Sequence, residues 1–175
     1  MVDTTTKISL IPEQMAARIR RRRDSACAAV WDLLDQVKDP EIPVLSLWDL
    51  GVLQDIVVQG QSIRVMIIPT YSGCPALREM KQDIRAVLAA AGYAEVEVVT
   101  QLAPAWSTDM ITSEGRQQLQ KYGIAPPVSH RDSPVICPLC ASPKTHLISQ
   151  FGSTACKALY RCESCDEPFD YFKCL

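Results

Sequence analysis

The sequence predicts an α+β protein in which a small α/β layer sandwich is followed by a β-rich, four-cysteine ribbon. Composition is the first reason, because 47% of the 175 residues are hydrophobic and 22% are charged, as in ordinary globular proteins. Helix-like and strand-like patterns alternate from Pro12 to Gly123. Six of the eight cysteines then fall between residues 137 and 175, which separates a cysteine-rich tail from the rest of the chain.

The first half of the sandwich is predicted to contain one helix and two strands. A helix is expected over residues 12–37, where apolar side chains recur at helical spacing until Pro40 ends the pattern. Residues 52–58 and 62–68 are rich in Val and Ile and read as strands. The short segment around Gly60 joins these strands as a hairpin.

The second half is predicted to contain a helix, a strand and a last helix. Residues 75–92 carry apolar side chains at helical spacing and end at Gly92, a good left-handed terminator. A strand follows over residues 95–102, and a helix over residues 112–122 closes at Gly123. The order helix, strand, strand, helix, strand, helix describes a compact layer sandwich.

A polar, proline-rich stretch after this region is typical of a semi-extended linker. We therefore divide the chain into an N-terminal extension (1–25), an α/β domain (26–127), a linker (128–134) and a ribbon domain (135–175). A tail of about 40 residues buries too little apolar surface to fold alone, so a structural metal is expected to supply the missing stability.

Charge and hydropathy exclude several classes of partner. The formal net charge of −2 argues against nucleic acid, and the arginines at 20–23 are interpreted as the solvated end of a helix. Residues 65–77 form the longest uncharged, largely apolar run, which is too short for a membrane span. The N-terminus lacks the apolar core of a signal peptide. We therefore expect a cytoplasmic protein whose clustered cysteines serve metal or redox chemistry rather than disulfides.

Two C-x-x-C pairs, separated by 21 residues, predict a metal site in the tail. Each pair on a tight turn brings two thiolates near one ion, so Cys137, Cys140, Cys162 and Cys165 complete a tetrahedral site. Zinc is the expected ion, and iron or an iron–sulfur cluster stays open because both also take four thiolates. A redox pair and plain core packing are the alternatives.

Two further tail cysteines have no place in this set. Cys156 is expected to pack under the ribbon, with the replacement of a ligand during metal transfer as the alternative. Cys174 stands next to the last residue and is expected to be an exposed thiol.

Cys74 stands where a strand gives way to a helix. With Pro75 at the first helical position, Cys74 would be the N-cap, where free backbone N–H groups and the helix dipole stabilise a thiolate. Such a thiolate could be a nucleophile or a soft-metal ligand, and the alternative is a small buried hydrophobe. Asp39 and Glu41 lie in another loop that could face Cys74, or they serve only to end a helix and cap a turn.

Three motifs resemble the small α/β domain of iron–sulfur cluster assembly factors of the SufT and cytosolic-targeting type. They are Asp39-Pro40-Glu41-Ile42-Pro43, Asp49-Leu50-Gly51-Val52 and the segment from Thr70 to Cys74-Pro75. The tail segment from Phe151 through Cys156 and Cys162 to Lys173 narrows the resemblance to the PaaD family, the D components of phenylacetyl-CoA epoxidase systems.

The resemblance implies an accessory or maturation role in aerobic phenylacetate catabolism. Such a protein would help to insert or repair the iron–sulfur cluster or the di-iron centre of the epoxidase, with the oxygenase and reductase subunits as partners. A homodimer is also expected from the family. By match to the family pattern, Cys74 would be the working thiol and a ligand of a transient iron–sulfur cluster, supported by Asp39, Glu41 and Thr70. The four paired tail cysteines would hold the ribbon metal.

The sequence carries no oxygenase machinery of its own. It lacks the Glu-x-x-His pair of di-iron bundles, the G-x-G-x-x-G of dinucleotide sites and the plant-type ferredoxin spacing. We therefore expect a protein that is not itself catalytic. Two other functions stay open, namely a structural zinc-ribbon docking subunit and an electron carrier that holds iron or a cluster in the tail.

Overall fold

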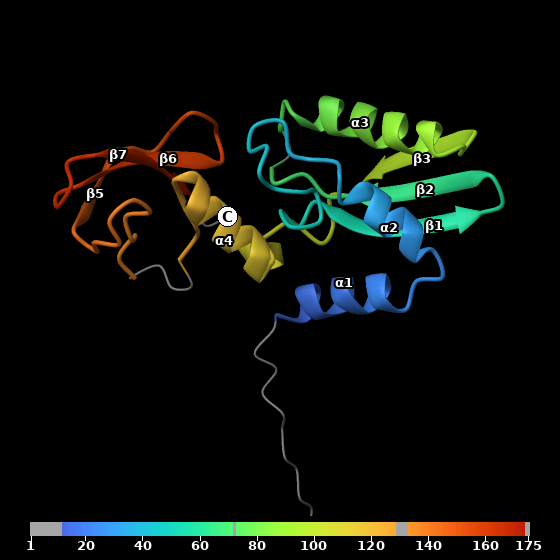
Figure 1. Cartoon of the computed structure of the whole chain (residues 1–175), viewed down its shortest axis with the longest axis horizontal. Coiled ribbons are helices and arrows are strands. Elements are labelled where there is room, and N and C mark those ends of the chain that lie inside the picture. Colours follow the sequence, from blue (N-terminus) through green and yellow to red (C-terminus); the bar gives the residue numbers. More distant parts are fainter. Residues whose placement is uncertain (1–11, 72, 129–132, 174–175) are drawn as a thin grey trace, which may run out of the picture.

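Two β-sheets flanked by helices make up the computed structural model, which describes residues 12–71, 73–128 and 133–173 (Figure 1). The first sheet has the strand order β1-β2-β3, and its strands are β1 (Leu53–Gln59), β2 (Ser62–Ile67) and β3 (Glu95–Thr100). The second has the order β4-β7-β6-β5, and its strands are β4 (Ile124–Ala125), β5 (Thr145–Ser149), β6 (Lys157–Cys162) and β7 (Pro168–Phe172). The α+β class predicted from the sequence is confirmed.

Helices flank the two sheets. They are α1 (Glu13–Arg23), α2 (Ala28–Leu34), α3 (Leu77–Ala90) and α4 (Ser113–Tyr122), with a short 3₁₀ turn η1 (Thr108–Met110). Helices α1 and α3 contact strands of the first sheet, and α4 contacts β4 of the second. In Figure 1 the first sheet lies between α3 on one side and α1 on the other. No helix among the described residues is both long and apolar enough to cross a membrane.

The first sheet owes its core to strict alternation along β2. Ile63, Val65 and Ile67 are all at most 2% exposed, and they belong to one apolar cluster with Ile84 and Leu88 of α3. Strand β2 pairs antiparallel with β1 and parallel with β3. A parallel pair needs a crossover, and α3 provides it. The connection from β2 into α3 therefore runs across one end of the sheet.

The single helix expected over residues 12–37 is wrong, because the chain breaks between α1 and α2. At the break the Ser25 hydroxyl accepts a hydrogen bond from the Cys27 backbone N–H at 3.3 Å and lies 3.0 Å from the Cys27 sulfur. A serine side chain that bonds nearby backbone competes with helical hydrogen bonding. The strand expected over 95–102 also ends earlier, at Thr100.

A buried arginine holds α1 on the first sheet. Arg18 is 0% exposed, and its guanidinium donates to the backbone carbonyls of Trp48 (2.7 Å), Leu53 (3.2 Å) and Met110 (2.7 Å). Burial lowers the pKa of Arg18 to about 10. The segment expected to be a separate N-terminal extension thus contributes a helix to the packed structure from Glu13 onward.

The tail sheet is joined to the first part of the molecule by backbone and by aromatic packing. Ile124 and Ala125 form β4, which pairs parallel with Asp170 and Tyr171 of β7. At the end of β7, Phe172 is fully buried and its ring lies 5.9 Å from that of Trp106. The segment assigned to the end of the first domain therefore supplies the edge strand of the second sheet.

Candidate functional site

The four paired tail cysteines come together at one end of the second sheet. The sulfur atoms of Cys137, Cys140, Cys162 and Cys165 all lie within 4.8 Å of one another. Two of the separations are 3.8 Å, between Cys137 and Cys165, and 3.5 Å, between Cys140 and Cys162. A tetrahedron with metal–sulfur bonds of about 2.3 Å has edges of about 3.8 Å. The donor set therefore fits one tetrahedral, thiolate-bound metal ion with little rearrangement.

Two matching turns position these thiols. Each C-x-x-C pair is followed by a residue with positive φ, Ala141 at 60° and Asp166 at 61°. The first cysteine of each pair donates its backbone N–H across the turn, Cys137 to Ser142 at 2.9 Å and Cys162 to Glu167 at 3.0 Å. Left-handed conformations are unfavourable for residues with a side chain, so these turns are held by their surroundings.

The protonation of the paired thiols is uneven. Burial opposes ionisation of Cys162, but the backbone N–H groups of Cys165 and Ser164 and the neighbouring thiols outweigh it and lower its pKa to about 6. The Ser142 N–H favours the thiolate of Cys140, yet the hydrogen bond from this thiol to Cys162 raises its pKa to about 12. Among the paired thiols, Cys162 is therefore the one whose surroundings most favour the thiolate, the form that binds a metal.

Cys74 lies between β2 and α3, as predicted, but it is not the N-cap. The N-cap is Ala76, and Cys74 lies in the turn before it. The backbone carbonyl of Cys74 accepts a hydrogen bond from the Leu77 N–H at 3.3 Å. Burial is the largest influence on its thiol and raises the pKa, and the carboxylates of Glu41 and Asp39 act in the same direction. The N–H groups of Ala76 and Leu77 lower it, so the expected helix-start effect is present but is outweighed.

The loop at residues 39–43 lies near enough to this thiol for the charges of Glu41 and Asp39 to raise its pKa. Asp39 is 5% exposed, and its Oδ1 accepts from the backbone N–H groups of Glu41 (2.9 Å) and Ile42 (2.7 Å). Burial raises the pKa of Asp39. Asp39 therefore shapes the loop through its backbone hydrogen bonds, and the supporting role of Glu41 at Cys74 stays a prediction. Thr70 lies half-buried just beyond the end of β2, and its supporting role stays a prediction.

Cys156 does not pack under the ribbon, contrary to expectation. It is 5% exposed and belongs to the apolar cluster of the first domain rather than to the cluster around the ribbon cysteines. Its sulfur lies 4.0 Å from Oε2 of Glu41 and 3.0 Å from the Thr154 hydroxyl. The tail therefore brings a second thiol to the loop that faces Cys74. Cys174 lies outside the described residues.

Two neighbours of these thiols were missed by sequence reasoning. Tyr71 lies close enough for Cys74, Glu41 and Cys156 all to raise its pKa, in addition to a larger effect of burial. Lys157 is 4% exposed, and its Nζ lies 3.5 Å from Oδ2 of Asp170. The one signal in the sequence that could have indicated Tyr71 and Lys157 is their position next to the cysteine motifs.

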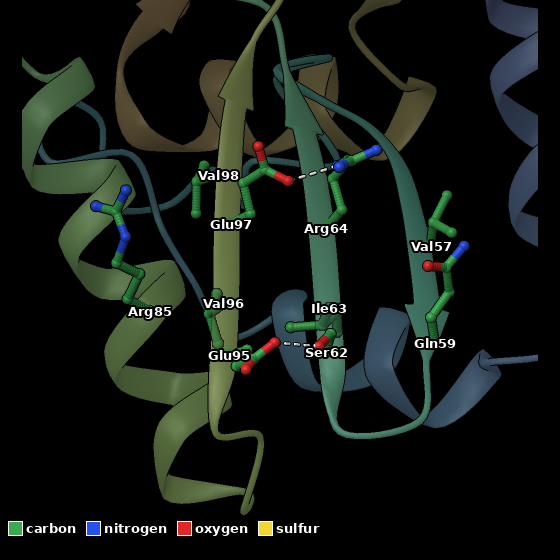
Figure 2. A pocket seen from close by; sticks show the side chains of 10 residues that line it. All are labelled: Val57, Gln59, Ser62, Ile63, Arg64, Arg85, Glu95, Val96, Glu97 and Val98. Atoms are coloured by element: carbon green, nitrogen blue, oxygen red, sulfur yellow. Dashed lines mark hydrogen bonds and ion pairs between the residues drawn. The ribbon is translucent and has the colours of Figure 1, made fainter.

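A shallow hollow of about 610 Å³ on the first sheet is a poor candidate for a site (Figure 2). Figure 2 shows that its face is crossed by a 2.6 Å ion pair between Arg64 and Glu97 and by a hydrogen bond from Ser62 to Glu95. The side chains of Arg64 and Glu97 are about 60% exposed. None of the residues predicted to be functional lines this hollow, and exposed pairs of this kind are common on protein surfaces.

Comparisons with known proteins agree with this two-part organisation. Residues 27–100 match the family described as "Iron-sulfur cluster assembly protein", and residues 126–173 match the "PaaD zinc beta ribbon domain". A crystal structure of a DUF59 domain from Bacillus anthracis has a TM-score of 0.50 at 23% identity, over 53% of this chain and 89% of that one. A Thermotoga maritima protein, TM0487, has a TM-score of 0.46 at 26% identity, over 57% of this chain and 95% of that one.

A curated protein of Escherichia coli (strain K12) is described as the D component of a "Putative 1,2-phenylacetyl-CoA epoxidase". It is 51% identical to this chain over 151 residues, which cover 83% of this chain and 92% of the relative. A match of this length extends into both domains. The chain belongs to the family of phenylacetyl-CoA epoxidase D components, and in this chain a segment that matches the iron–sulfur assembly family precedes one that matches the PaaD zinc ribbon.

Proposed function

We propose that this protein is an accessory maturation component of a phenylacetyl-CoA 1,2-epoxidase in aerobic phenylacetate catabolism. It assists assembly of an iron–sulfur cluster or a di-iron centre in the oxygenase and reductase subunits, in the cytoplasm, and is not itself catalytic. One observation carries the proposal. The half-buried thiol of Cys74 lies near enough to Glu41 for the charge of that carboxylate to raise the pKa of the thiol, and both residues belong to the segment that matches the iron–sulfur assembly family.

The chemistry of the two cysteine groups supports a division of labour. Four thiolates around one ion leave no open position, which is typical of a structural metal that stabilises a small domain. We assign zinc to this ribbon site. Cys74, by contrast, is a single thiol next to a carboxylate, so a metal or cluster held there keeps positions for a partner's ligands. An incomplete set of this kind suits transient loading, including a transient iron–sulfur cluster, better than permanent storage.

Iron and sulfide content of the epoxidase tests this proposal. The oxygenase and reductase subunits are expressed with the wild-type chain, without it, and with Cys74→Ser, and are then purified and analysed. We expect less iron, or less iron and sulfide, in the last two preparations. Equal metal content in all three would refute a maturation role.

A docking role for the ribbon is the second candidate, because its surface exposes large apolar side chains. Leu139 is 57% exposed, Ile148 50% and Phe151 70%. Exposed apolar groups of this size often contact partners. If Cys74→Ser abolished epoxidase activity while fold and subunit binding were retained, docking alone would be inadequate. An electron-carrier role would require redox-active iron in the tail, and a colourless protein that contains only zinc would exclude it.

A further inference from the structure

Two thiols from different domains face the same carboxylate. Cys156, from the loop before β6, lies with its sulfur 4.0 Å from Glu41 Oε2. The charges of Glu41 and Asp39 act on both Cys156 and Cys74. Cys156 therefore contacts the Glu41 carboxylate directly, and Cys74 lies near enough for the same two carboxylates to raise its pKa.

The ribbon holds Cys156 firmly in this position. The Cys156 carbonyl accepts the Lys173 backbone N–H at 3.0 Å, and the Gly152 N–H donates to the Lys157 carbonyl at 2.9 Å. A Cβ on Gly152 would lie only 2.5 Å from Oδ1 of Asp170 and 3.3 Å from the backbone of Ala158, so the loop packs closely against β6 and β7. The ribbon metal does not need this thiol, because its four ligands are complete without Cys156.

The local charges favour a cation. Glu41 and Asp39 supply two carboxylates. The positive charge of buried Lys157 acts on Cys156 and Asp39, and Asp170, 3.5 Å away, offsets part of it. A mixed set of thiolate and carboxylate ligands suits borderline divalent ions such as Fe²⁺. Within the described residues only the ribbon thiols already lie within reach of a single ion. Cys74, Cys156 and Glu41 must therefore close around a metal by side-chain rotation, as expected for a site that releases what it binds.

We propose that Cys74, Cys156 and Glu41 form a second metal-binding site, built across the two domains, that takes a divalent ion such as Fe²⁺ as cargo. This inference deepens the proposed function, since it gives the maturation site a ligand that only the ribbon can supply. It also explains why an assembly domain is joined to a ribbon: the ribbon presents Cys156 to the other domain.

Cobalt binding to the full-length protein tests the proposal. The ribbon is first filled with Zn²⁺, then Co²⁺ is added anaerobically, and thiolate-to-cobalt charge-transfer absorption is recorded while a chromophoric chelator monitors zinc release. We expect one additional Co²⁺ without zinc release. Cys74→Ser and Cys156→Ser should each remove about half of the charge-transfer absorption. Each should weaken binding by about tenfold or more, since even the loss of an outer partner of a metal ligand costs 10–100-fold.

Matched variants keep the result interpretable. Cys27→Ser removes another half-buried thiol that contacts Ser25 and lies outside the proposed site, so it should bind Co²⁺ like the wild type. If Cys156→Ser does not fold, Cys156→Ala and Glu41→Gln are used in its place. A variant is counted as folded when it binds one zinc ion per chain. Absence of a second Co²⁺ site in the wild type, or wild-type binding by both Cys156 variants, would refute the inter-domain site.

The outcomes also separate this site from the proposed function. Loss of Co²⁺ binding in Cys156→Ser, together with full iron content in co-expressed epoxidase, would support the site and refute the maturation role. Unchanged Co²⁺ binding in Cys156→Ser, together with low epoxidase iron in Cys74→Ser, would refute the site and leave the maturation role in place.

Discussion

Phe172→Ala should strongly destabilise the contact between the two domains. Phe172 is 0% exposed, and its ring packs 5.9 Å from Trp106, which is itself 6% exposed. Truncating a buried phenylalanine to alanine costs about 3–5 kcal/mol. With a urea m-value of about 2–3 kcal/mol/M, a loss of about 4 kcal/mol lowers the unfolding midpoint by about 1.3–2 M. The separated ribbon should also withdraw Cys156 from Glu41.

Urea unfolding of the zinc-loaded protein measures the first effect, and the rate of Cys156 alkylation measures the second. Phe151→Ala is the matched control, because Phe151 is in the same ribbon but is 70% exposed, its ring contacts Lys173 by a cation–π interaction, and its backbone hydrogen bonds to Ser149 do not depend on the ring. The control should lose less than about 1 kcal/mol. Similar losses for both variants, with unchanged Cys156 alkylation, would show that the buried aromatic contact does not join the domains.

Three further predictions concern the ribbon metal, the buried arginine and the Cys74 thiol. Cys140→Ser should abolish stoichiometric metal binding by the ribbon. It should also remove the hydrogen-exchange protection of β5–β7, whereas the protection of β1–β3 should persist. Retained metal would contradict the four-cysteine site. Arg18→Met removes the buried guanidinium that donates to three backbone carbonyls and should cost about 3–5 kcal/mol in urea unfolding. The exposed control Arg23→Ala should cost less than about 1 kcal/mol, and equal costs would refute this role of Arg18. Because the pKa of Cys74 lies above the ordinary 9.0, the rate of Cys74 alkylation should reach half of its maximum above pH 9. Glu41→Gln removes a negative charge near the thiol and should move this midpoint to lower pH. An unchanged midpoint would show that Glu41 does not face the thiol.

Features set by local spacing could be predicted from the sequence. The two C-x-x-C pairs fix the ribbon ligands because each turn is short and carries its own thiols. Alternation in residues 62–67 and the helical pattern after Pro75 likewise indicated the strand and crossover helix on either side of Cys74. That the loop containing Asp39 and Glu41 could face Cys74 was one of two interpretations of these carboxylates, and the family resemblance then favoured it over a role in ending a helix and capping a turn.

Features set by tertiary contacts could not be predicted. Arg18 is buried only because three carbonyls from distant segments converge on it, and arginine is ordinarily exposed. The position of Cys156 depends on how β7 pairs with β4, which no local pattern in residues 151–157 reveals. The pKa of the Cys74 thiol likewise depends on tertiary contacts. Burial and the carboxylates of another loop raise it, and they outweigh the nearby backbone N–H groups, which lower it.

The role of Cys74 in maturation is tested most directly by the iron content of epoxidase subunits co-expressed with this chain. Two variants are compared with the wild type at equal, verified zinc loading of the ribbon: Cys74→Ser and the control Cys27→Ser. We expect iron to fall with Cys74→Ser and to stay at the wild-type level with Cys27→Ser. Full iron content with Cys74→Ser would contradict a maturation role for this thiol.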